Sequence, residues 1–211
     1  MFVKILEYII GGITYILFIK NVDGVRNIPD KGPYIIASNH TSYMDIWAIT
    51  IVLYFKKNQY IRFLAKKELL QDWYVIFLQK LFYKPENKPI YFDINNPRND
   101  LIKECIRTFK KNQIIGIFPE GKRSLDGKIQ KGKTGVVRIS LGGKVPIIPI
   151  GITGAFEIMP TGKNIPKLKK NITLNIGKPI YLNKYYEKKI TKKLLRNITD
   201  NIMKEIARLS G

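Results

Sequence analysis

Residues 34–45 read Tyr34-Ile35-Ile36-Ala37-Ser38-Asn39-His40-Thr41-Ser42-Tyr43-Met44-Asp45, and this stretch decides the fold of the chain. The apolar run at residues 34–37 predicts a buried strand, and residues 43–55 that follow the polar turn predict a helix. Similar strand-like runs alternate with helix-like segments along the rest of the sequence. Alternation of this kind predicts an α/β fold with a mostly parallel central sheet and crossover helices.

The remaining elements follow from the same two periodicities. We expect strands at residues 34–37, 60–65, 89–93, 114–118, 145–152 and 172–176, and helices at residues 43–55, 67–80, 98–111 and 134–141. Residues 183–209 place their Ile and Leu side chains on one helical face, which predicts an amphipathic helix that closes the domain. Ligand sites in such sheets gather at the carboxyl ends of strands. The turn after residues 34–37 and the loop after residues 114–118 are therefore expected to share one cleft.

The composition indicates one globular domain with an anionic partner. The chain has 211 residues, of which 45% are hydrophobic and 25% are charged, and its formal net charge is +21. A positive excess of this size favours either nucleic acid or a lipid surface as partner. The single cysteine, Cys105, excludes an internal disulfide, and we expect it to pack in a helix rather than to react.

The first residues favour the lipid surface. Apolar side chains recur at helical spacing from Phe2 to Leu17, but the uncharged stretch at residues 8–19 is too short for the roughly twenty residues of a membrane-spanning helix. We therefore expect residues 1–22 to form an amphipathic, membrane-associating helix and residues 23–211 to form the main domain. The alternative is a helix that simply packs on the domain. Basic charge beside an exposed apolar helix favours an anionic phospholipid membrane, and no nucleic-acid-binding motif is present.

The only histidine of the chain, His40, is a candidate general base. An imidazole accepts and returns a proton near neutral pH, and a carboxylate on one ring nitrogen leaves the other free to act as the base. Asp45 can supply this carboxylate only if His40 lies on the turn before the helix, which the helix-capping hydroxyls of Thr41 and Ser42 favour. The alternative is a capping box, in which Asp45 serves only the first turn of the helix.

A second polar cluster follows the fourth strand-like run. It reads Phe118-Pro119-Glu120-Gly121-Lys122-Arg123-Ser124. A glycine lets the backbone approach a ligand, and the planar arginine fork matches phosphate oxygens, so this loop is a candidate phosphate site. Glu120 could accept a hydrogen bond from a substrate hydroxyl. The alternative is an ordinary turn with solvated charges.

Three motifs in this order resemble those of one enzyme family. Residues 39–45, residues 118–124 and the run Val145-Pro146-Ile147-Ile148-Pro149-Ile150 are similar to the first, third and fourth motifs of the 1-acyl-sn-glycerol-3-phosphate acyltransferases. The resemblance covers about residues 24–152. It implies transfer of an acyl chain from an acyl thioester to the sn-2 hydroxyl of lysophosphatidic acid, which gives phosphatidic acid in phospholipid biosynthesis.

The resemblance also implies roles for individual residues. His40 would deprotonate the acceptor hydroxyl, Asp45 would orient it, and no covalent acyl-enzyme would be needed. The substrate-binding residues implied by the resemblance are Glu120, Gly121, Arg123, Lys66 and Lys133, with Arg123 on the acceptor phosphate.

The chain departs from the family pattern at two positions. Lys122 stands where the family usually has threonine, and Ile94 stands where the second motif usually ends in arginine. We expect Lys88 or Arg98 as candidates to replace that arginine. Because of Ile94, the resemblance supports the reaction type more strongly than the identity of the acceptor.

The implied enzyme needs no cofactor and no metal ion, and it uses acyl-CoA or acyl carrier protein as co-substrate. We expect it at the cytoplasmic face of the cell membrane as a peripheral, monotopic protein. Two alternatives remain at this stage. One is an acyltransferase that acts on another lysolipid or on glycerol-3-phosphate, and the other is a noncatalytic protein of the same fold that binds anionic lipid. The sequence leaves open the donor, the preferred chain length and the oligomeric state.

Overall fold

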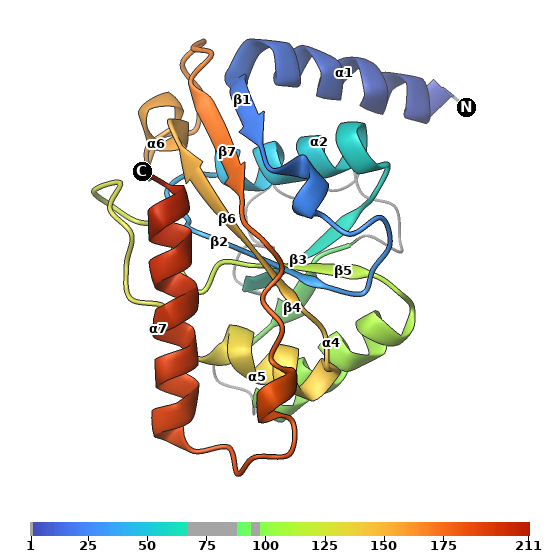
Figure 1. Cartoon of the computed structure of the whole chain (residues 1–211). Coiled ribbons are helices and arrows are strands. Elements are labelled where there is room, and N and C mark those ends of the chain that lie inside the picture. Colours follow the sequence, from blue (N-terminus) through green and yellow to red (C-terminus); the bar gives the residue numbers. More distant parts are fainter. Residues whose placement is uncertain (1, 67–87, 94–97) are drawn as a thin grey trace.

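One mixed sheet organises residues 2–66, 88–93 and 98–211, which are the residues that this computed structural model describes (Figure 1). The sheet has seven strands in the order β1-β7-β6-β2-β5-β3-β4. The strands are β1 (Ile19–Asp23), β2 (Ile35–Ser38), β3 (Ile61–Lys66), β4 (Ile90–Phe92), β5 (Ile114–Ile117), β6 (Ile147–Thr153) and β7 (Ile172–Ile176).

Helices cover both faces of this sheet (Figure 1). They are α1 (Phe2–Phe18), α2 (Met44–Lys57), α4 (Arg98–Lys110), α5 (Gly135–Gly143), the short α6 (Ala155–Ile158) and α7 (Lys192–Leu209), with 3₁₀ turns η1 (Val25–Asn27) and η4 (Asn183–Tyr185). These elements confirm the α/β class that the sequence predicts. The helix expected at residues 67–80 lies outside the described residues.

The central strands run parallel, so their carboxyl ends meet at one edge. β2 pairs in parallel with both β5 and β6, and β3 pairs in parallel with both β5 and β4. β7 runs antiparallel to β6, and β1 is parallel to β7 at the outer edge. The turn after β2 and the loop after β5 therefore begin side by side, as the sequence predicts.

Both faces of the sheet are buried, which explains the unbroken apolar runs of its strands. Successive β2 residues point to opposite faces. Ile36 joins the cluster that contains Ile49 of α2, whereas Ile35 joins the opposite cluster with Ile139 of α5 and Ile206 of α7. β2 is thus held between two cores, which gives the turn that follows it a rigid base.

The C-terminal helix is shorter than the sequence predicts. We expected a helix over residues 183–209, but α7 begins at Lys192 and only η4 is helical before it. Thr191 has extended backbone, and its side chain accepts a hydrogen bond from the Leu194 backbone N–H at 3.1 Å. This N-cap starts the helix. Ile190, which we placed on the apolar face, is 42% exposed.

The N-terminal segment differs from the prediction at its end. α1 stops at Phe18, and residues 19–23 form β1, so the boundary expected after residue 22 falls inside a strand of the sheet. Phe18 and Ile19 are both buried in the core, which explains why the chain joins the sheet here. Within the described residues, no helix combines the length and the apolar character needed to cross a membrane.

α1 lies on the domain with part of its apolar surface uncovered. The Tyr8 and Tyr15 rings each make an edge contact with the Phe55 ring of α2. Ile13 and Ile16 are 52% and 66% exposed. The helix thus packs on the domain, as the alternative expected, and also presents an apolar side outward, as a membrane-associating helix requires.

Candidate active site

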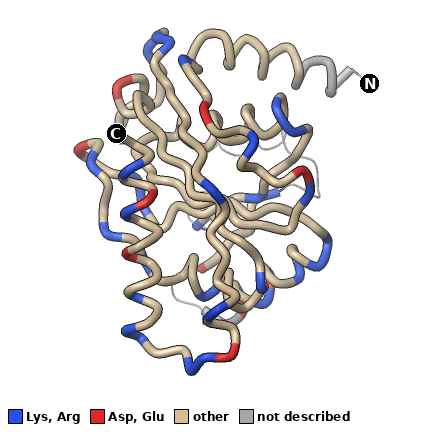
Figure 2. The backbone as a smooth tube through the Cα atoms, in the orientation of Figure 1, with Lys and Arg blue, Asp and Glu red and all other residues tan. Residues whose placement is uncertain are grey.

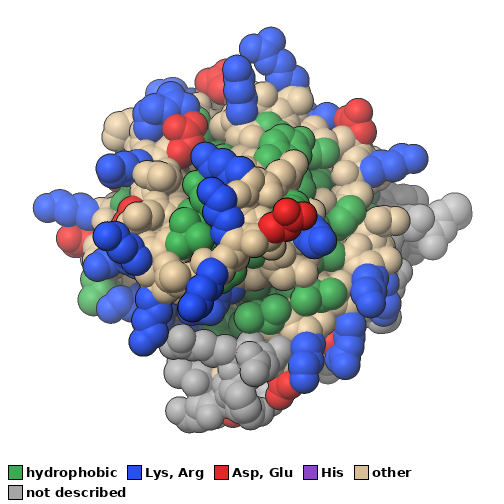
Figure 3. Space-filling model, turned by 60° about the horizontal axis from the view of Figure 1, so that its bottom comes forward, with side chains coloured by type: hydrophobic (Ala, Val, Ile, Leu, Met, Phe, Trp, Pro, Cys, Tyr) green, Lys and Arg blue, Asp and Glu red, His purple; other side chains and the backbone are tan. Residues whose placement is uncertain are grey.

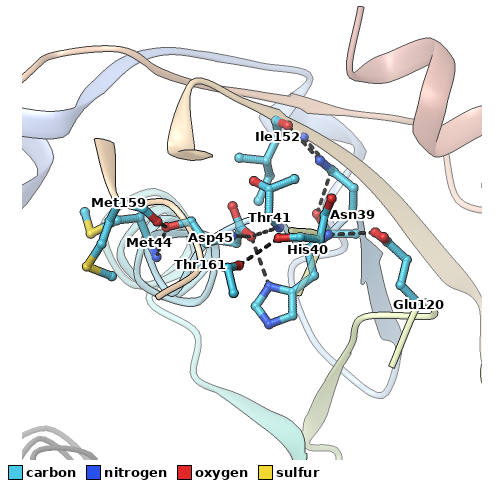
Figure 4. A network of polar contacts seen from close by, with 12 residues as sticks. Asn39, His40, Thr41, Met44, Asp45, Glu120, Ile152, Met159 and Thr161 are labelled. Atoms are coloured by element: carbon cyan, nitrogen blue, oxygen red, sulfur yellow. Dashed lines mark hydrogen bonds and ion pairs between the residues drawn. The ribbon is translucent and has the colours of Figure 1, made fainter. Parts of the chain in front are cut away.

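A buried asparagine fixes the turn between β2 and α2. The Asn39 side chain, 2% exposed, donates to the Ile152 carbonyl and accepts from the Ile152 N–H, both at 2.8 Å (Figure 4). These two bonds tie the start of the turn to β6. The sequence predicts no role for Asn39. A polar residue between two apolar elements was the only signal.

His40 and Asp45 meet in the way that the sequence predicts. His40 Nδ1 lies 3.0 Å from Asp45 Oδ2, and the same oxygen accepts the N–H groups of Thr41 at 2.6 Å and Ser42 at 2.8 Å (Figure 4). The helix begins at Met44, so His40 lies on the turn before it. Asp45 therefore both holds the histidine and satisfies the turn that leads into the helix, so the two interpretations describe one arrangement.

This contact fixes the chemistry of the ring. An ionised carboxylate can only accept hydrogen bonds, so the Nδ1 atom of a neutral His40 must carry the proton, and Nε2 keeps its lone pair. The Asp45 side chain is fully buried, and the His40 side chain is 11% exposed. None of the described side chains hydrogen-bonds Nε2. The ring therefore presents a proton acceptor at the carboxyl end of β2.

Aromatic rings support the imidazole from one side. The Phe118 ring stacks on the His40 ring at a centroid distance of 3.8 Å and an interplanar angle of 12°. The Phe63 ring stacks in turn on Phe118 at 5.5 Å. Together with the Asp45 contact, this stack fixes the plane of the base. The sequence predicts Phe118 only as the end of a strand.

Glu120 joins the two motifs. One carboxylate oxygen accepts the His40 backbone N–H and the other accepts the Gln130 backbone N–H, both at 2.8 Å. The side chain is 3% exposed, and its burial raises the pKa of the carboxyl above the ordinary value of 4.5. Glu120 thus holds the His40 turn against the loop. Its contact with substrate remains a prediction.

The loop after β5 is closed by backbone bonds and a glycine. Gly121 has a φ of +74°, and a Cβ at this position would lie 2.9 Å from Lys133 Nζ. The Lys133 N–H donates to the Pro119 carbonyl at 2.7 Å, and the Ser124 N–H donates to the His40 carbonyl at 2.8 Å. The absence of a side chain on Gly121 therefore lets the Lys133 ammonium lie over the loop, beside the turn that carries His40.

Arg123 lies over an aromatic ring of the first motif. Its guanidinium carbon is 3.6 Å from the centre of the Tyr43 ring. Stacking through the face of the guanidinium leaves the N–H groups at its edge able to bind a phosphate. Tyr43 is a positioning residue that the sequence analysis missed, since an aromatic side chain before a helix carries no signal of this contact. Lys122, next to it, is exposed.

The remaining expected residues are only partly assembled. Lys66 ends β3, at the same edge of the sheet as His40 but two strands away from β2. Lys88 precedes β4, and therefore lies at the opposite edge, so it cannot replace an arginine that follows the strand. Ile94 lies outside the described residues, and the structure describes only the backbone of Arg98, at the start of α4.

Cys105 is buried in α4, and burial raises the pKa of its thiol to about 12, which agrees with a packing role. Among the described residues, no group of three or more His, Cys, Asp or Glu side chains is arranged to hold a metal ion.

The chain is similar to several known proteins. Residues 20–153 match the family model described as Acyltransferase, which spans all three motifs. The chain is 33% identical to the 1-acyl-sn-glycerol-3-phosphate acyltransferase of Bacillus subtilis over 74% of this chain and 71% of that protein. It is 28% identical to the chloroplastic enzyme of that name from Brassica napus, over 81% of this chain but 47% of the plant protein. The chain thus spans about half the length of some curated relatives.

A solved structure shows the same fold. The crystal structure of the 1-acyl-sn-glycerophosphate acyltransferase PlsC from Thermotoga maritima superposes with a TM-score of 0.70, at 24% sequence identity. The match covers 99% of this chain and 80% of the other.

Proposed function

Because this chain belongs to the acyltransferase family, we propose that it transfers an acyl chain from a thioester to the sn-2 hydroxyl of 1-acyl-glycerol-3-phosphate. The product is phosphatidic acid. The observation that carries the proposal is the 3.0 Å contact between His40 Nδ1 and Asp45, which leaves Nε2 available beside the loop that bears Arg123. Curated relatives with this activity support the choice of acceptor.

In the proposed mechanism, His40 acts on the acceptor hydroxyl. Nε2 takes the hydroxyl proton as the oxygen attacks the thioester carbonyl carbon, and the imidazolium that forms is stabilised by the Asp45 carboxylate. The tetrahedral intermediate collapses with cleavage of the carbon–sulfur bond. The imidazolium returns its proton to the departing thiolate. The enzyme ends the cycle with neutral His40 and needs no acyl-enzyme.

The acceptor phosphate is assigned to the loop after β5. Arg123 offers a planar pair of N–H donors, and the nearby Lys133 ammonium adds positive charge above Gly121. Hydrogen bonds to charged groups are worth about 1.5–3 kcal/mol, so loss of Arg123 should be measurable in the acceptor KM. Lys66, at the same edge of the sheet, is assigned to substrate by the family resemblance.

The donor and the location complete the proposal. The donor is acyl-CoA or acyl carrier protein, because either delivers the thioester that the reaction requires. The enzyme lies at the cytoplasmic face of the cell membrane, where the outward apolar side of α1 rests in the interface between lipid and water. The exposed side chains of Ile13 and Ile16 support contact of α1 with lipid.

A panel assay tests the proposed function. Purified protein is incubated with lysophosphatidic acid, glycerol-3-phosphate and a neutral lysolipid, each with acyl-CoA and with acyl carrier protein as donor. We expect phosphatidic acid from lysophosphatidic acid with at least one donor. Transfer only to another acceptor would refute the assignment of lysophosphatidic acid as the acceptor. The absence of any transfer would favour the noncatalytic lipid-binding alternative.

A further inference from the structure

The connection between β6 and β7 exposes two large apolar side chains. Ile165 is 83% exposed and Leu168 is 81% exposed, the highest values among the large hydrophobic side chains that the structure describes. Both belong to an irregular segment, residues 160–170, that follows α6. Apolar side chains presented together in this way mark a surface that binds a partner or a membrane.

The same segment is strongly basic. Residues 160–170 contain four exposed lysines and no acidic residue; the lysines are Lys163, Lys167, Lys169 and Lys170. Figure 2 shows basic positions at the tip of this connection, beside the end of α1. Apolar side chains that enter the interface, flanked by lysines that meet headgroups, are the combination that binds an anionic bilayer.

Hydrogen bonds fasten this segment to the site. The Thr161 hydroxyl donates to the Ser124 carbonyl at 2.7 Å, and the Ser42 hydroxyl donates to the Met159 carbonyl at 2.7 Å. Ser124 and Ser42 belong to the two motifs that assemble around His40. Leu125, next to Ser124, is itself 77% exposed. The start of the segment therefore adjoins the two motifs around His40.

The other end of the segment adjoins α1. The Asn171 N–H donates to the Phe18 carbonyl at 3.2 Å, and β7 then pairs with β1 from Ile172 opposite Ile19. Figure 1 shows the connection beside the C-terminal end of α1. The outward apolar side of α1 and residues 160–170 are thus neighbours.

Charge alone does not select this surface. Figure 3 shows Lys and Arg side chains spread over another face of the molecule, between hydrophobic and acidic side chains. Two exposed acids, Asp126 and Glu157, also lie close to the segment in sequence or on the adjoining loop. What distinguishes residues 160–170 is that four exposed lysines flank, in sequence, the two most exposed of the large apolar side chains that the structure describes, in a segment whose start is tied to the site.

We propose that residues 160–170 form a second bilayer contact, in which Ile165 and Leu168 enter the interface of an anionic membrane and the four lysines bind its headgroups. The proposal rests on the proposed function and deepens it, because it names the surface from which the site takes its lipid acceptor. Contact at both α1 and this segment would hold the rim of the site against the bilayer. A lipid acceptor could then reach His40 without crossing water.

Vesicle binding by the full chain tests the proposal. We compare Ile165→Ser/Leu168→Ser and the fourfold lysine-to-glutamine variant of the segment with wild type, on vesicles of phosphatidylcholine with and without phosphatidylglycerol. Loss of a buried Ile or Leu is worth about tenfold or more in partitioning, and each surface lysine roughly fivefold. We expect weaker binding in both variants, with the lysine effect confined to anionic vesicles and abolished by salt.

Matched controls come from the opposite end of the molecule, around the start of α7. Tyr181→Ser/Ile190→Ser removes two side chains that are 61% and 42% exposed. A second control removes four exposed lysines by glutamine substitution, at Lys178, Lys189, Lys192 and Lys193. Because all substituted residues are exposed, the variants should fold as wild type does. Equal losses in the controls and in the segment variants would overturn the proposal.

A label on the segment reports insertion directly. An environment-sensitive nitrobenzoxadiazole is attached to the cysteine of Ile165→Cys. Labelling is selective because Cys105 is buried and shielded from the reagent in the folded protein. We expect a blue shift and stronger emission on anionic vesicles for this label, and no change for Tyr181→Cys. Unchanged emission at residue 165 while the protein is bound would overturn the proposal. If the fourfold lysine variant lost binding to acidic carrier protein but kept vesicle binding, the surface would bind a protein, and the proposal would also be overturned.

Activity separates this proposal from the proposed function. Ile165→Ser/Leu168→Ser should lose turnover of a long-chain acceptor in vesicles and keep turnover of a short-chain, water-soluble acceptor. A wild-type protein that transfers no acyl group to either acceptor would refute the proposed function alone, since vesicle binding and the label still decide the bilayer contact.

Discussion

Substitution of Asp45 by asparagine separates the charge of this side chain from its geometry. All three contacts of the carboxylate, to His40 Nδ1 and to the N–H groups of Thr41 and Ser42, converge on one oxygen. The amide oxygen of an asparagine can take this position and keep every contact. The reverse orientation would point an NH₂ group at two backbone donors and is therefore disfavoured. With the amide oxygen facing His40 Nδ1, this atom keeps its proton, so the imidazole tautomer is the same as in wild type.

The expected loss follows from these contacts. A hydrogen bond to a charged group contributes about 1.5–3 kcal/mol and a neutral one about 0.5–1.5 kcal/mol, so removal of the charge costs about 1–1.5 kcal/mol, or roughly tenfold in kcat. The other oxygen, Oδ1, is buried and has no hydrogen-bond partner in the part of the chain that the structure describes. An NH₂ group there is unpaired as well, so the free energy of unfolding falls chiefly because the Thr41 and Ser42 N–H groups donate to a neutral oxygen, which costs about 1–3 kcal/mol in total.

Steady-state acyl transfer and urea unfolding of Asp45→Asn measure the two effects. Asp45→Ala is the comparison, because it also leaves the N–H groups of Thr41 and Ser42 without their acceptor and should be less active and less stable than Asp45→Asn. A folded Asp45→Asn protein as inactive as His40→Ala would refute the reasoning, since orientation alone would then contribute nothing. Wild-type activity in Asp45→Asn would show that the charge has no role.

Three further perturbations test other parts of the site and its surroundings. Arg123→Ala should raise the acceptor KM by about 10- to 100-fold with little change in the thioester KM, and equal effects on both substrates would remove Arg123 from the phosphate site. Tyr43→Ala should raise the acceptor KM about two- to fivefold, and Tyr43→Phe should hardly change it. The free energy of unfolding of wild type, measured relative to that of Glu120→Gln, should fall as the pH rises from below 4.5 through the raised pKa of Glu120. The reason is that this buried carboxyl ionises less readily in the folded chain than in the unfolded chain. Urea titrations at several pH values measure this difference, which would be constant if burial did not raise the pKa. Ile13→Ser/Ile16→Ser should weaken binding to anionic vesicles in a flotation assay and spare turnover of a soluble acceptor, whereas unchanged binding would show that α1 does not contact lipid.

Much of the site follows from residues that are close in sequence. The contact between His40 and Asp45 was predictable because Asp45 lies five positions after His40, and local geometry decides whether they meet. The shared edge of β2 and β5 was predictable because parallel strands align their carboxyl ends. The structure confirms both expectations.

Contacts between distant segments were not predictable. Three contacts depend on the three-dimensional arrangement of separate motifs. They are the bonds of Asn39 to Ile152, the stack of Phe118 on His40 and the contact of Arg123 with Tyr43. Sequence patterns report which face of an element is apolar, but they do not report which polar or aromatic side chain lies opposite.

The errors at element ends have local causes. The uncharged apolar run of α1 extends to Ile19, the first residue of β1, so periodicity did not show that the helix stops at Phe18. The segment before α7 carries apolar residues at helical spacing, but Thr191 caps the helix and excludes Ile190 from it. Capping and edge-strand pairing decided these boundaries, and neither is visible in hydropathy alone.

The most direct test of the central claim is the activity of His40→Ala. Acyl transfer to lysophosphatidic acid is measured beside wild type, with circular dichroism and urea unfolding as evidence that the variant is folded. If His40 Nε2 is the general base, kcat/KM falls by about 10²- to 10⁴-fold while the free energy of unfolding changes little. A folded His40→Ala protein that retains near wild-type turnover would contradict the claim.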